Sequence, residues 1–211
     1  TERLKNGWAR SGATLFMTLL SAVKVLLHRY SGQTDIVVGS PIAGREYPEL
    51  EEQLGLYINM LALRTSFGRD WTFEKLLKKV RQTTLEGCAH GLYPFDRLVE
   101  DLSQTRDLGR SPLFDVVVNL QNGGMNELIF GDDQVGFGKF RKVSAGSKYD
   151  LSFDFMEEPE GIELAIEFRT DLFDDPTVAA LGGHLLSILD AVSRDPGQRI
   201  DRLAMLSPGE R

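Results

Sequence analysis

The sequence predicts an α/β fold in which a mixed β-sheet is flanked by helices. Helical and strand-like patterns follow one another without the regular alternation that a parallel sheet requires, and a strong hairpin pattern adds antiparallel strands. The chain has 211 residues, of which 42% are hydrophobic, so it can bury a substantial core. The fold class follows from these three observations.

The first elements are a core helix and two strands. Residues 13–30 carry apolar side chains on most faces and are followed by Gly32, which suits a left-handed helix end. The stretch DIVVGSPIAGRE then predicts a strand that leads into a loop. Residues 56–65 have apolar side chains on both alternating faces, which is typical of a covered strand. We therefore expect both strands to be internal.

Two helices are expected next. Thr72 is placed to cap a helix with one apolar face and one basic face, and the basic face is expected to be solvated. Pro94 fits the first turn of a second, short helix. The expected apolar positions are Phe73, Leu76, Leu77 and Val80 in the first helix, and Phe95, Leu98, Val99 and Leu102 in the second.

The rest of the chain predicts strands and a long final helix. PLFDVVVNLQN and NELIF indicate strands separated by a turn at NGGMN, and YDLSFDFMEE and GIELAIEFRT indicate a hairpin around PEG. Asp175 is expected to cap the final helix, with Pro176 in its first turn and His184 packed near its buried stripe. That stripe comprises Val178, Leu181, Leu185, Leu189 and Val192.

Composition and charge exclude several classes of function. The formal net charge is -7 and no basic cluster stands clear of acidic neighbours, which disfavours nucleic-acid binding. Cys88 is the single cysteine, so an internal disulfide is impossible and a cytoplasmic setting is expected. The apolar run at residues 13–27 is too short to span a membrane, and no signal peptide is expected. The chain is interpreted as a piece of a longer protein.

A search for catalytic patterns finds none that the residues alone can support. The sequence has no phosphate-binding glycine loop, no nucleophile elbow and no histidine pair spaced to grip a metal. Its three histidines, His28, His90 and His184, fall in three different predicted elements. Neither a catalytic residue nor a metal site is therefore predicted.

Several stretches in order resemble a known family. LGLYINMLALR, HGLYPFDRLVEDL and RDLGRSPLFDVVVNLQN look like three consecutive signatures of the condensation domains of nonribosomal peptide synthetases, and their spacing is similar too. DIVVGSPIAGRE before them and KYDLSFDFMEEPEGIELAIEFRTDLFD after them are also similar to the family. The resemblance covers nearly the whole chain.

The resemblance implies a chloramphenicol acetyltransferase-like fold of two lobes with a tunnel between them. The family's catalytic motif has two adjacent histidines, three further residues and Asp-Gly, and it belongs to the N-terminal lobe. No two histidines are adjacent in this sequence. The expectation is therefore a half domain, with residues 1–194 as the C-terminal lobe and residues 195–211 as the start of a linker toward a following adenylation domain.

The same resemblance implies candidate residues for the tunnel wall. Asn59 is a candidate whose amide either reaches the reacting centre or bonds backbone at a strand edge. Asp150 and Ser152 are polar residues of an apolar strand, and they either line the tunnel or follow ordinary outward alternation. His90 is assigned no general-base role, and Arg64 and Arg110 are expected to make structural ion pairs or bonds to backbone carbonyls.

The function implied is peptide-bond formation between aminoacyl or peptidyl thioesters, with this fragment inactive by itself. The implied partners are the N-terminal lobe, upstream and downstream peptidyl carrier proteins and an adenylation domain. The substrates would arrive on the phosphopantetheine of the carriers, and no cofactor is expected to bind this chain directly. Two alternatives stay open: the lobe of an epimerisation or cyclisation domain, or a noncatalytic carrier-docking module. Departures such as Met60, where the family usually has threonine, and Gly91 weaken assignments to single residues.

Overall fold

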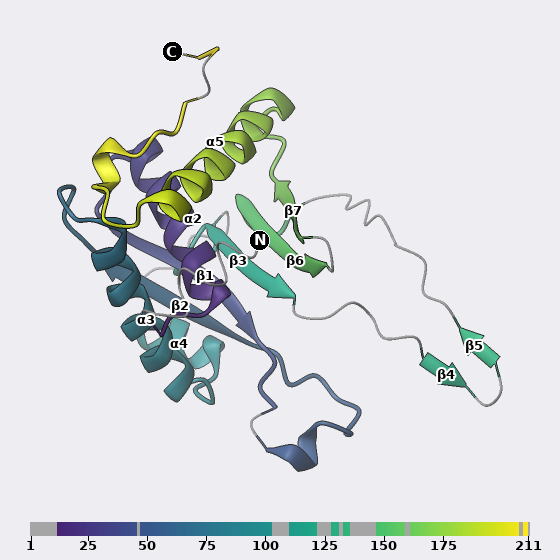
Figure 1. The fold of residues 1–211 in the computed structure, drawn as a ribbon. Coiled ribbons are helices and arrows are strands. Elements are labelled where there is room, and N and C mark those ends of the chain that lie inside the picture. The colour runs from purple at the N-terminus through teal and green to yellow at the C-terminus, as the bar shows by residue number, and fades with distance from the viewer. Residues whose placement is uncertain are drawn as a thin grey trace.

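A five-stranded mixed β-sheet forms the centre of the protein, in the strand order β2-β1-β3-β6-β7 (Figure 1). The computed structural model describes residues 12–45, 47–102, 110–121, 128–130, 133–135, 147–158, 161–206 and 209–210. Within the sheet β1, β3 and β6 run parallel, while β2 and β7 run antiparallel to their neighbours. The strands are β1 (Asp35–Ile42), β2 (Asn59–Ser66), β3 (Val116–Gln121), β6 (Leu151–Glu158) and β7 (Gly161–Phe168). The predicted fold class is confirmed.

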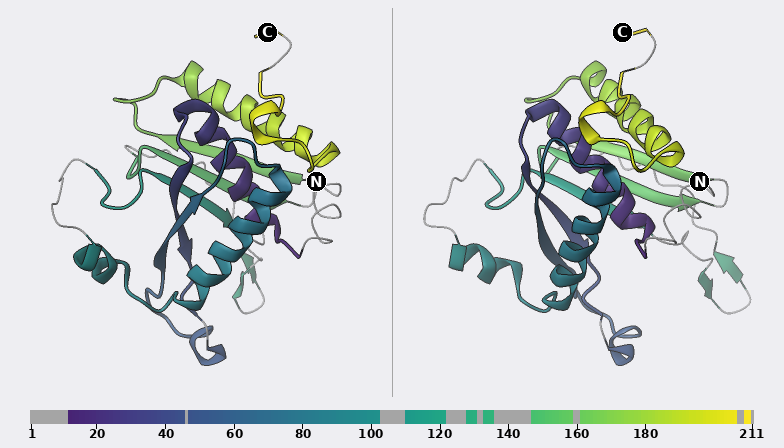
Figure 2. Two further views of the ribbon diagram at one scale, coloured as in Figure 1. Left: turned by 90° about the vertical axis from the view of Figure 1, so that its left-hand side faces the viewer. Right: turned by 60° about the vertical axis from the view of Figure 1, so that its left-hand side comes forward.

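Three helices cover one face of this sheet, and a fourth lies on the other side of β1 and β2 (Figure 2). The covering helices are α2 (Leu15–Ser31), α3 (Phe73–Ala89) and α5 (Asp175–Arg194), and the fourth is α4 (Phe95–Leu102). Short 3-10 helices occur at Pro48–Leu50 and Ile200–Arg202. A separate antiparallel pair is formed by β4 (Leu128–Phe130) and β5 (Asp133–Val135). The turn predicted at residues 122–126 lies outside the described residues.

Helix α2 is the central core helix, as its sequence predicts. Thr14 caps its start by accepting the N–H of Met17, and Gly32 ends it with φ of 72°. Its buried face carries one charged side chain, that of Lys24. The Nζ of Lys24 donates to the carbonyls of Ile36 at 3.0 Å and Leu63 at 2.7 Å. Burial lowers the pKa of Lys24 to about 7, and the charge of Asp35 opposes that shift.

Helices α3 and α4 form where the sequence predicts helices, and part of the α4 stripe is buried. Thr72 caps α3 through a 3.3 Å bond from the N–H of Lys75. In α4 Val99 is buried, whereas Leu102 is 61% exposed. The predicted stripe is thus covered at Val99 and open to solvent at Leu102, the last residue of the helix.

Strand β2 is also less covered than its sequence predicts. It begins at Asn59 rather than at residue 56, and it is an edge strand of the described sheet instead of an internal one. Leu61 and Leu63 are buried on the helix side, whereas Arg64 is exposed. Apolar side chains on alternating faces indicate that both faces are covered, but they carry no information about how many neighbouring strands there are.

The hairpin and the last helix follow the predicted periods. Strands β6 and β7 pair from Leu151–Phe168 to Glu158–Gly161. The N-cap of α5 is Asp174 instead of the predicted Asp175: its Oδ1 accepts the N–H of Thr177 at 2.9 Å. The whole predicted stripe of α5 is buried. By length and composition α5 is apolar enough to cross a membrane, but this stripe packs in the core, as expected of a core helix.

The segment after α5 packs against the same core. Ile200 and Leu203 are buried, and Arg29 of α2 donates to both of their carbonyls. A bridge between Thr72 and Arg199 ties this segment to the start of α3. Packing therefore continues beyond the boundary predicted at residue 194.

An arm that includes residues 43–45 and 47–58 projects from the ends of β1 and β2 (Figure 1). Gly44 has φ of 65°, and a Cβ there would lie 1.9 Å from the carbonyl oxygen of Tyr57. Leu54 and Leu56 are almost fully exposed on this arm. Large apolar side chains exposed next to one another are typical of interaction surfaces.

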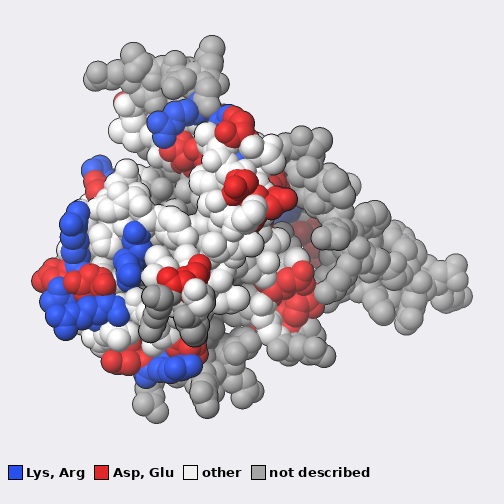
Figure 3. Space-filling view, turned by 90° about the horizontal axis from the view of Figure 1, so that it is seen from above, with Lys and Arg blue, Asp and Glu red and all other residues white. Residues whose placement is uncertain are grey.

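Acidic and basic side chains are intermixed on the face drawn in Figure 3. Among the described residues, Lys78 pairs with Glu74 and Arg194 with Asp190, each one helical turn apart. Neighbouring charges of opposite sign cancel at a distance, so the described part of this face presents no large field of one sign.

Candidate functional site

The amino-terminal ends of the three parallel strands meet at one edge of the sheet. Asp35 begins β1, while Asp115 and Asp150 directly precede β3 and β6. The N–H of Asp150 donates to the carbonyl of Asp115 at 3.0 Å, which fixes these two residues side by side. The edge therefore gathers three carboxylates from segments far apart in the sequence.

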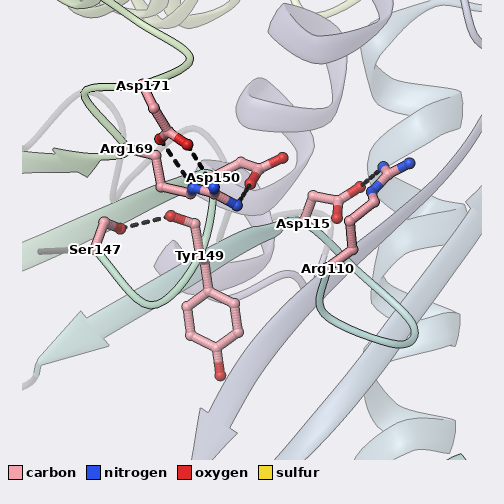
Figure 4. Close-up of polar contacts among 7 residues, drawn as sticks. All are labelled: Arg110, Asp115, Ser147, Tyr149, Asp150, Arg169 and Asp171. Carbon is pink, nitrogen blue, oxygen red and sulfur yellow. Dashed lines mark hydrogen bonds and ion pairs between the residues drawn. The ribbon is translucent and has the colours of Figure 1, made fainter. Parts of the chain in front are cut away.

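A polar cavity of about 280 Å³ lies at this edge, near the side of the sheet where α4 packs. Arg110 pairs with Asp115 at 2.5 Å, and Arg169 reaches Asp150 at 3.5 Å (Figure 4). The remaining lining residues are Phe95, Ser111, Pro112, Lys148 and Tyr149. Because its lining carries charges of both signs, the cavity suits a polar group better than an apolar one.

Arg169 links the cavity to the turn after β7. Its guanidinium makes two bonds to Asp171, at 3.1 and 2.6 Å, in addition to the longer contact with Asp150. The bond from Arg169 lowers the pKa of Asp171, and the bond to Asp171 raises the pKa of Arg169. Arg169 is thus held in place by Asp171 and makes a long contact of 3.5 Å with the carboxylate of Asp150.

A second, apolar cavity of about 410 Å³ lies at the same edge, beneath α2 and α5. It shares Asp115 and Asp150 with the polar cavity, so the two carboxylates stand between the two spaces. At its rim Asp35 is bonded by Arg64 at 3.0, 3.1 and 2.6 Å, which lowers the pKa of Asp35 to about 2. The apolar lining includes Leu26, Leu27, Ile36, Val37, Leu113, Phe114, Leu151, Phe173 and Leu181.

Two of the three predicted wall residues lie at this edge. Asp150 lines both cavities. Ser152 is half-buried in β6 opposite Val117, on the face that α2 and α5 leave free, and its hydroxyl has no hydrogen bond among the described residues. The structure therefore brings Asp150 and Ser152 together.

Asn59, the third predicted wall residue, lies toward the opposite end of the sheet. It pairs with Ile42, the last residue of β1, about 10 Å along the strands from the level of Ser152. Its Nδ2 donates to the carbonyls of Gly91 and Tyr93, both at 2.8 Å, and its Oδ1 accepts the N–H of Phe95 at 3.1 Å. The amide thus holds the loop before α4 and caps that helix.

The histidines are placed as the sequence predicts. His90 is exposed at the end of α3. His184 is buried, with Nδ1 at 2.6 Å from the hydroxyl of Tyr30 and Nε2 at 3.1 Å from Glu210. Burial, and secondarily the charge of Glu210, raises the pKa of Tyr30. Within the described ranges no group of three or more His, Cys, Asp or Glu could hold a metal ion.

The ion pairs expected for Arg64 and Arg110 are confirmed, whereas the role of Arg169 was not predicted from the sequence. The signal that could have revealed it is the Arg-Thr-Asp order after the second hairpin strand, because Arg169 and Asp171 pair across two positions. Its contact to Asp150 depends on the register of β6 and β7, which the sequence does not specify.

Comparison with known proteins identifies the family. A family model described as the condensation domain matches residues 1–211. The chain belongs to the condensation-domain family. Gramicidin S synthase 2 of Brevibacillus brevis is 42% identical over 201 residues, which are 95% of this chain and 4% of that protein. Surfactin synthase subunit 2 of Bacillus subtilis (strain 168) is 37% identical over 210 residues, 100% of this chain and 6% of that protein.

Solved structures share the fold of this condensation-domain chain. A four-domain nonribosomal peptide synthetase bound to AMP and glycine superposes with a TM-score of 0.88 at 24% identity, over 98% of this chain and 17% of that one. The X-domain from teicoplanin biosynthesis gives 0.84 at 28% identity, over 97% and 47%. The first condensation domain of the CDA synthetase gives 0.79 at 21%, over 98% and 45%. The chain thus spans a few per cent of its curated relatives and under half of the single-domain structures.

Proposed function

We propose that this chain is the C-terminal lobe of a condensation domain that joins aminoacyl or peptidyl groups carried as thioesters. The observation that carries the proposal is the family match over the whole chain, combined with solved condensation and X-domain chains about twice as long. Residues 1–194 are the lobe, and residues 195–211 lead toward a following adenylation domain while packing partly on the lobe.

In this proposal the reaction takes place between two lobes. An acceptor amine on one carrier protein attacks the donor thioester on another, and the histidine motif of the N-terminal lobe orients the amine or takes its proton. Both reactants arrive tethered, so holding them at attack distance supplies much of the rate enhancement. This chain contributes a wall, formed by the sheet face that α2, α3 and α5 leave uncovered.

Three residues of this chain are proposed to shape the wall. Asp150, which Arg169 contacts at 3.5 Å, and Ser152, whose hydroxyl has no hydrogen bond among the described residues, lie close enough at the start of β6 to contact the same substrate group. Asn59 acts at a distance from them, by fixing the loop that precedes α4. It is a positioning residue, because both ends of its amide are occupied by backbone groups.

The partners follow from the same proposal. They are the N-terminal lobe, upstream and downstream peptidyl carrier proteins and an adenylation domain, all in the cytoplasm. Phosphopantetheine arrives on the carriers and is no resident cofactor of this chain. The exposed Leu54 and Leu56 of the arm support a contact with the other lobe.

Intact-protein mass spectrometry of transfer between two loaded carrier proteins tests this proposal. We expect transfer by a protein extended upstream by one lobe, and none by the 211-residue chain alone. Transfer by the chain alone would require catalytic groups within these residues and would contradict the proposal.

The same assay separates the alternatives. Inversion of a carrier-bound residue, or ring closure, would assign the lobe to an epimerisation or cyclisation domain. Carrier binding by the extended protein without any reaction would assign it to a docking module.

A further inference from the structure

The central sheet is forked at its amino-terminal edge. β1 pairs with β2 over eight residue pairs and β3 pairs with β6 over six, but β1 and β3 register at Gly39–Val117 alone. The β2-β1 and β3-β6-β7 parts of the sheet are thus joined at one point, and β1 and β3 separate before it. The ring of Phe114 lies over Gly39 at that junction, where a Cβ would come within 2.2 Å of it.

The apolar cavity of about 410 Å³ occupies this fork. Residues 35–37 of β1 form one side and residues 113–116 form the other, while Leu26 of α2 and Leu181 of α5 close it on the helix side. The exposed Gln33 and Thr177 stand at its mouth. Its volume lies within the roughly 300–1,000 Å³ typical of ligand sites.

The backbone groups of Val37 face the fork, on the side of β1 away from its partner Arg64 in β2. The N–H of Phe67 donates to the carbonyl of Thr34 at 2.9 Å, so alternate residues from Thr34 onward turn their backbone groups toward β2. Val37 is out of phase with them, so its N–H and C=O point away from β2 and into the fork, and among the described residues the register between β1 and β3 is at Gly39–Val117 and does not include Val37. Backbone groups withdrawn from water need a hydrogen-bond partner, and here a ligand can provide it.

The charges at the rim favour a neutral ligand. Asp35 is paired with Arg64, Asp115 with Arg110, and Asp150 with Arg169. Each carboxylate at the rim therefore has a guanidinium within contact distance, although Asp150 shares that of Arg169 with Asp171. What the cavity offers beyond these pairs is apolar surface and the open strand edge of Val37.

We propose that the fork binds an extended chain carrying amides and apolar substituents, which pairs with Val37 as an inserted strand. An added strand gains main-chain hydrogen bonds, and its side groups fill apolar space. The inference rests on the proposed function, which supplies two sources of this chemistry: the peptidyl group of a thioester and the pantetheine arm of a carrier protein. The site uses residues of this lobe alone and differs from the wall at Ser152.

The test uses the complete two-lobe domain and calorimetric titration with two probes. One probe is the N-acetylcysteamine thioester of a short leucine-rich peptide, and the other is pantetheine. Thr177→Trp closes the mouth, and Ala179→Trp adds the same bulk to an exposed position of α5 outside the cavity lining. We expect Thr177→Trp to weaken binding roughly tenfold or more, and Ala179→Trp to leave it within about twofold.

The two sources and the strand pairing are separated by the probes. Tight binding of the peptidyl thioester identifies the peptidyl group, and tight binding of pantetheine identifies the arm. N-methylation of the peptide amides should abolish binding to Val37, because it removes the N–H that the carbonyl accepts. Gln33→Trp is a second mouth variant if Thr177→Trp does not fold. No saturable binding, or equal binding by the mouth variants and the control, overturns the inference.

Failure of this inference is distinguishable from failure of the proposed function. If the wild-type domain transfers between carriers but Thr177→Trp does not weaken probe binding, the fork site is refuted and the proposed function stands. If Thr177→Trp weakens probe binding but the wild-type domain shows no transfer, the fork site is supported and the proposed function is refuted.

Discussion

Asn59 provides the sharpest test of how the structure assigns roles within the wall. Its amide makes three hydrogen bonds, to Gly91, Tyr93 and Phe95, across more than thirty residues of sequence. Each such bond contributes about 0.5–1.5 kcal/mol net. Because the site is half-buried, the lower half of the summed range applies, and Asn59→Ala should lower the free energy of unfolding by about 2 kcal/mol.

Urea denaturation of the complete domain measures this loss. Asn59→Asp keeps the acceptor for Phe95 but sets a carboxylate against two carbonyl oxygens, so it should destabilise at least as much as alanine does. Ser152→Ala is the matched control, and its unfolding free energy should stay within about 0.5 kcal/mol of wild type. If Asn59→Ala keeps wild-type stability while transfer falls about tenfold, the positioning role is refuted and a direct contact with substrate is supported.

Three further predictions follow from the same packing. Between pH 7 and 10.5 the unfolded chain holds a proton on Lys24 that the folded chain has released, so the unfolding free energy should rise with pH. From pH 7.5 to 9.5 the rise should be on the order of 2 kcal/mol relative to Lys24→Met, and a parallel pH profile of the two proteins would contradict the burial argument. Gly44→Ala should destabilise the fold clearly more than the roughly 1 kcal/mol expected for Gly32→Ala. Both glycines have positive φ, but of the two only Gly44 lacks space for a Cβ. Equal melting temperatures of the two variants would refute this. In sizing chromatography the 211-residue chain should associate through its arm, and a Leu54→Ser/Leu56→Ser variant should be more monomeric. Unchanged elution of the variant would show that the arm does not mediate association.

Periodic sequence patterns predicted the elements that pack on one side. The stripe of α5 and the pairing of β6 with β7 follow from periods of 3.6 and 2, which burial on a single face imposes. The N-cap of α5 differed by one position because Asp174 and Asp175 are both suitable caps, and the choice depends on how the chain enters from β7.

The site was predicted less completely because it depends on register between distant segments. Asp150 was found because the sequence predicted it as a polar residue of an apolar strand, although it lies directly before β6, and its contact with Arg169 depends on the β6-β7 register. The hydrogen bonds of Asn59 could not be predicted, because the sequence does not distinguish an amide that faces substrate from one that bonds backbone groups. The fork was likewise invisible, since local preferences of β1 and β3 say nothing about where the two strands part.

Hydrogen–deuterium exchange tests most directly the claim that this chain is one lobe whose free sheet face and arm meet another. The comparison is between the complete domain and the 211-residue chain, in peptides covering residues 51–58 and 147–156. The account predicts that both segments exchange more slowly in the complete domain, while the core helix α2 exchanges equally in the two proteins. Equal exchange of residues 51–58 and 147–156 in both proteins would contradict it.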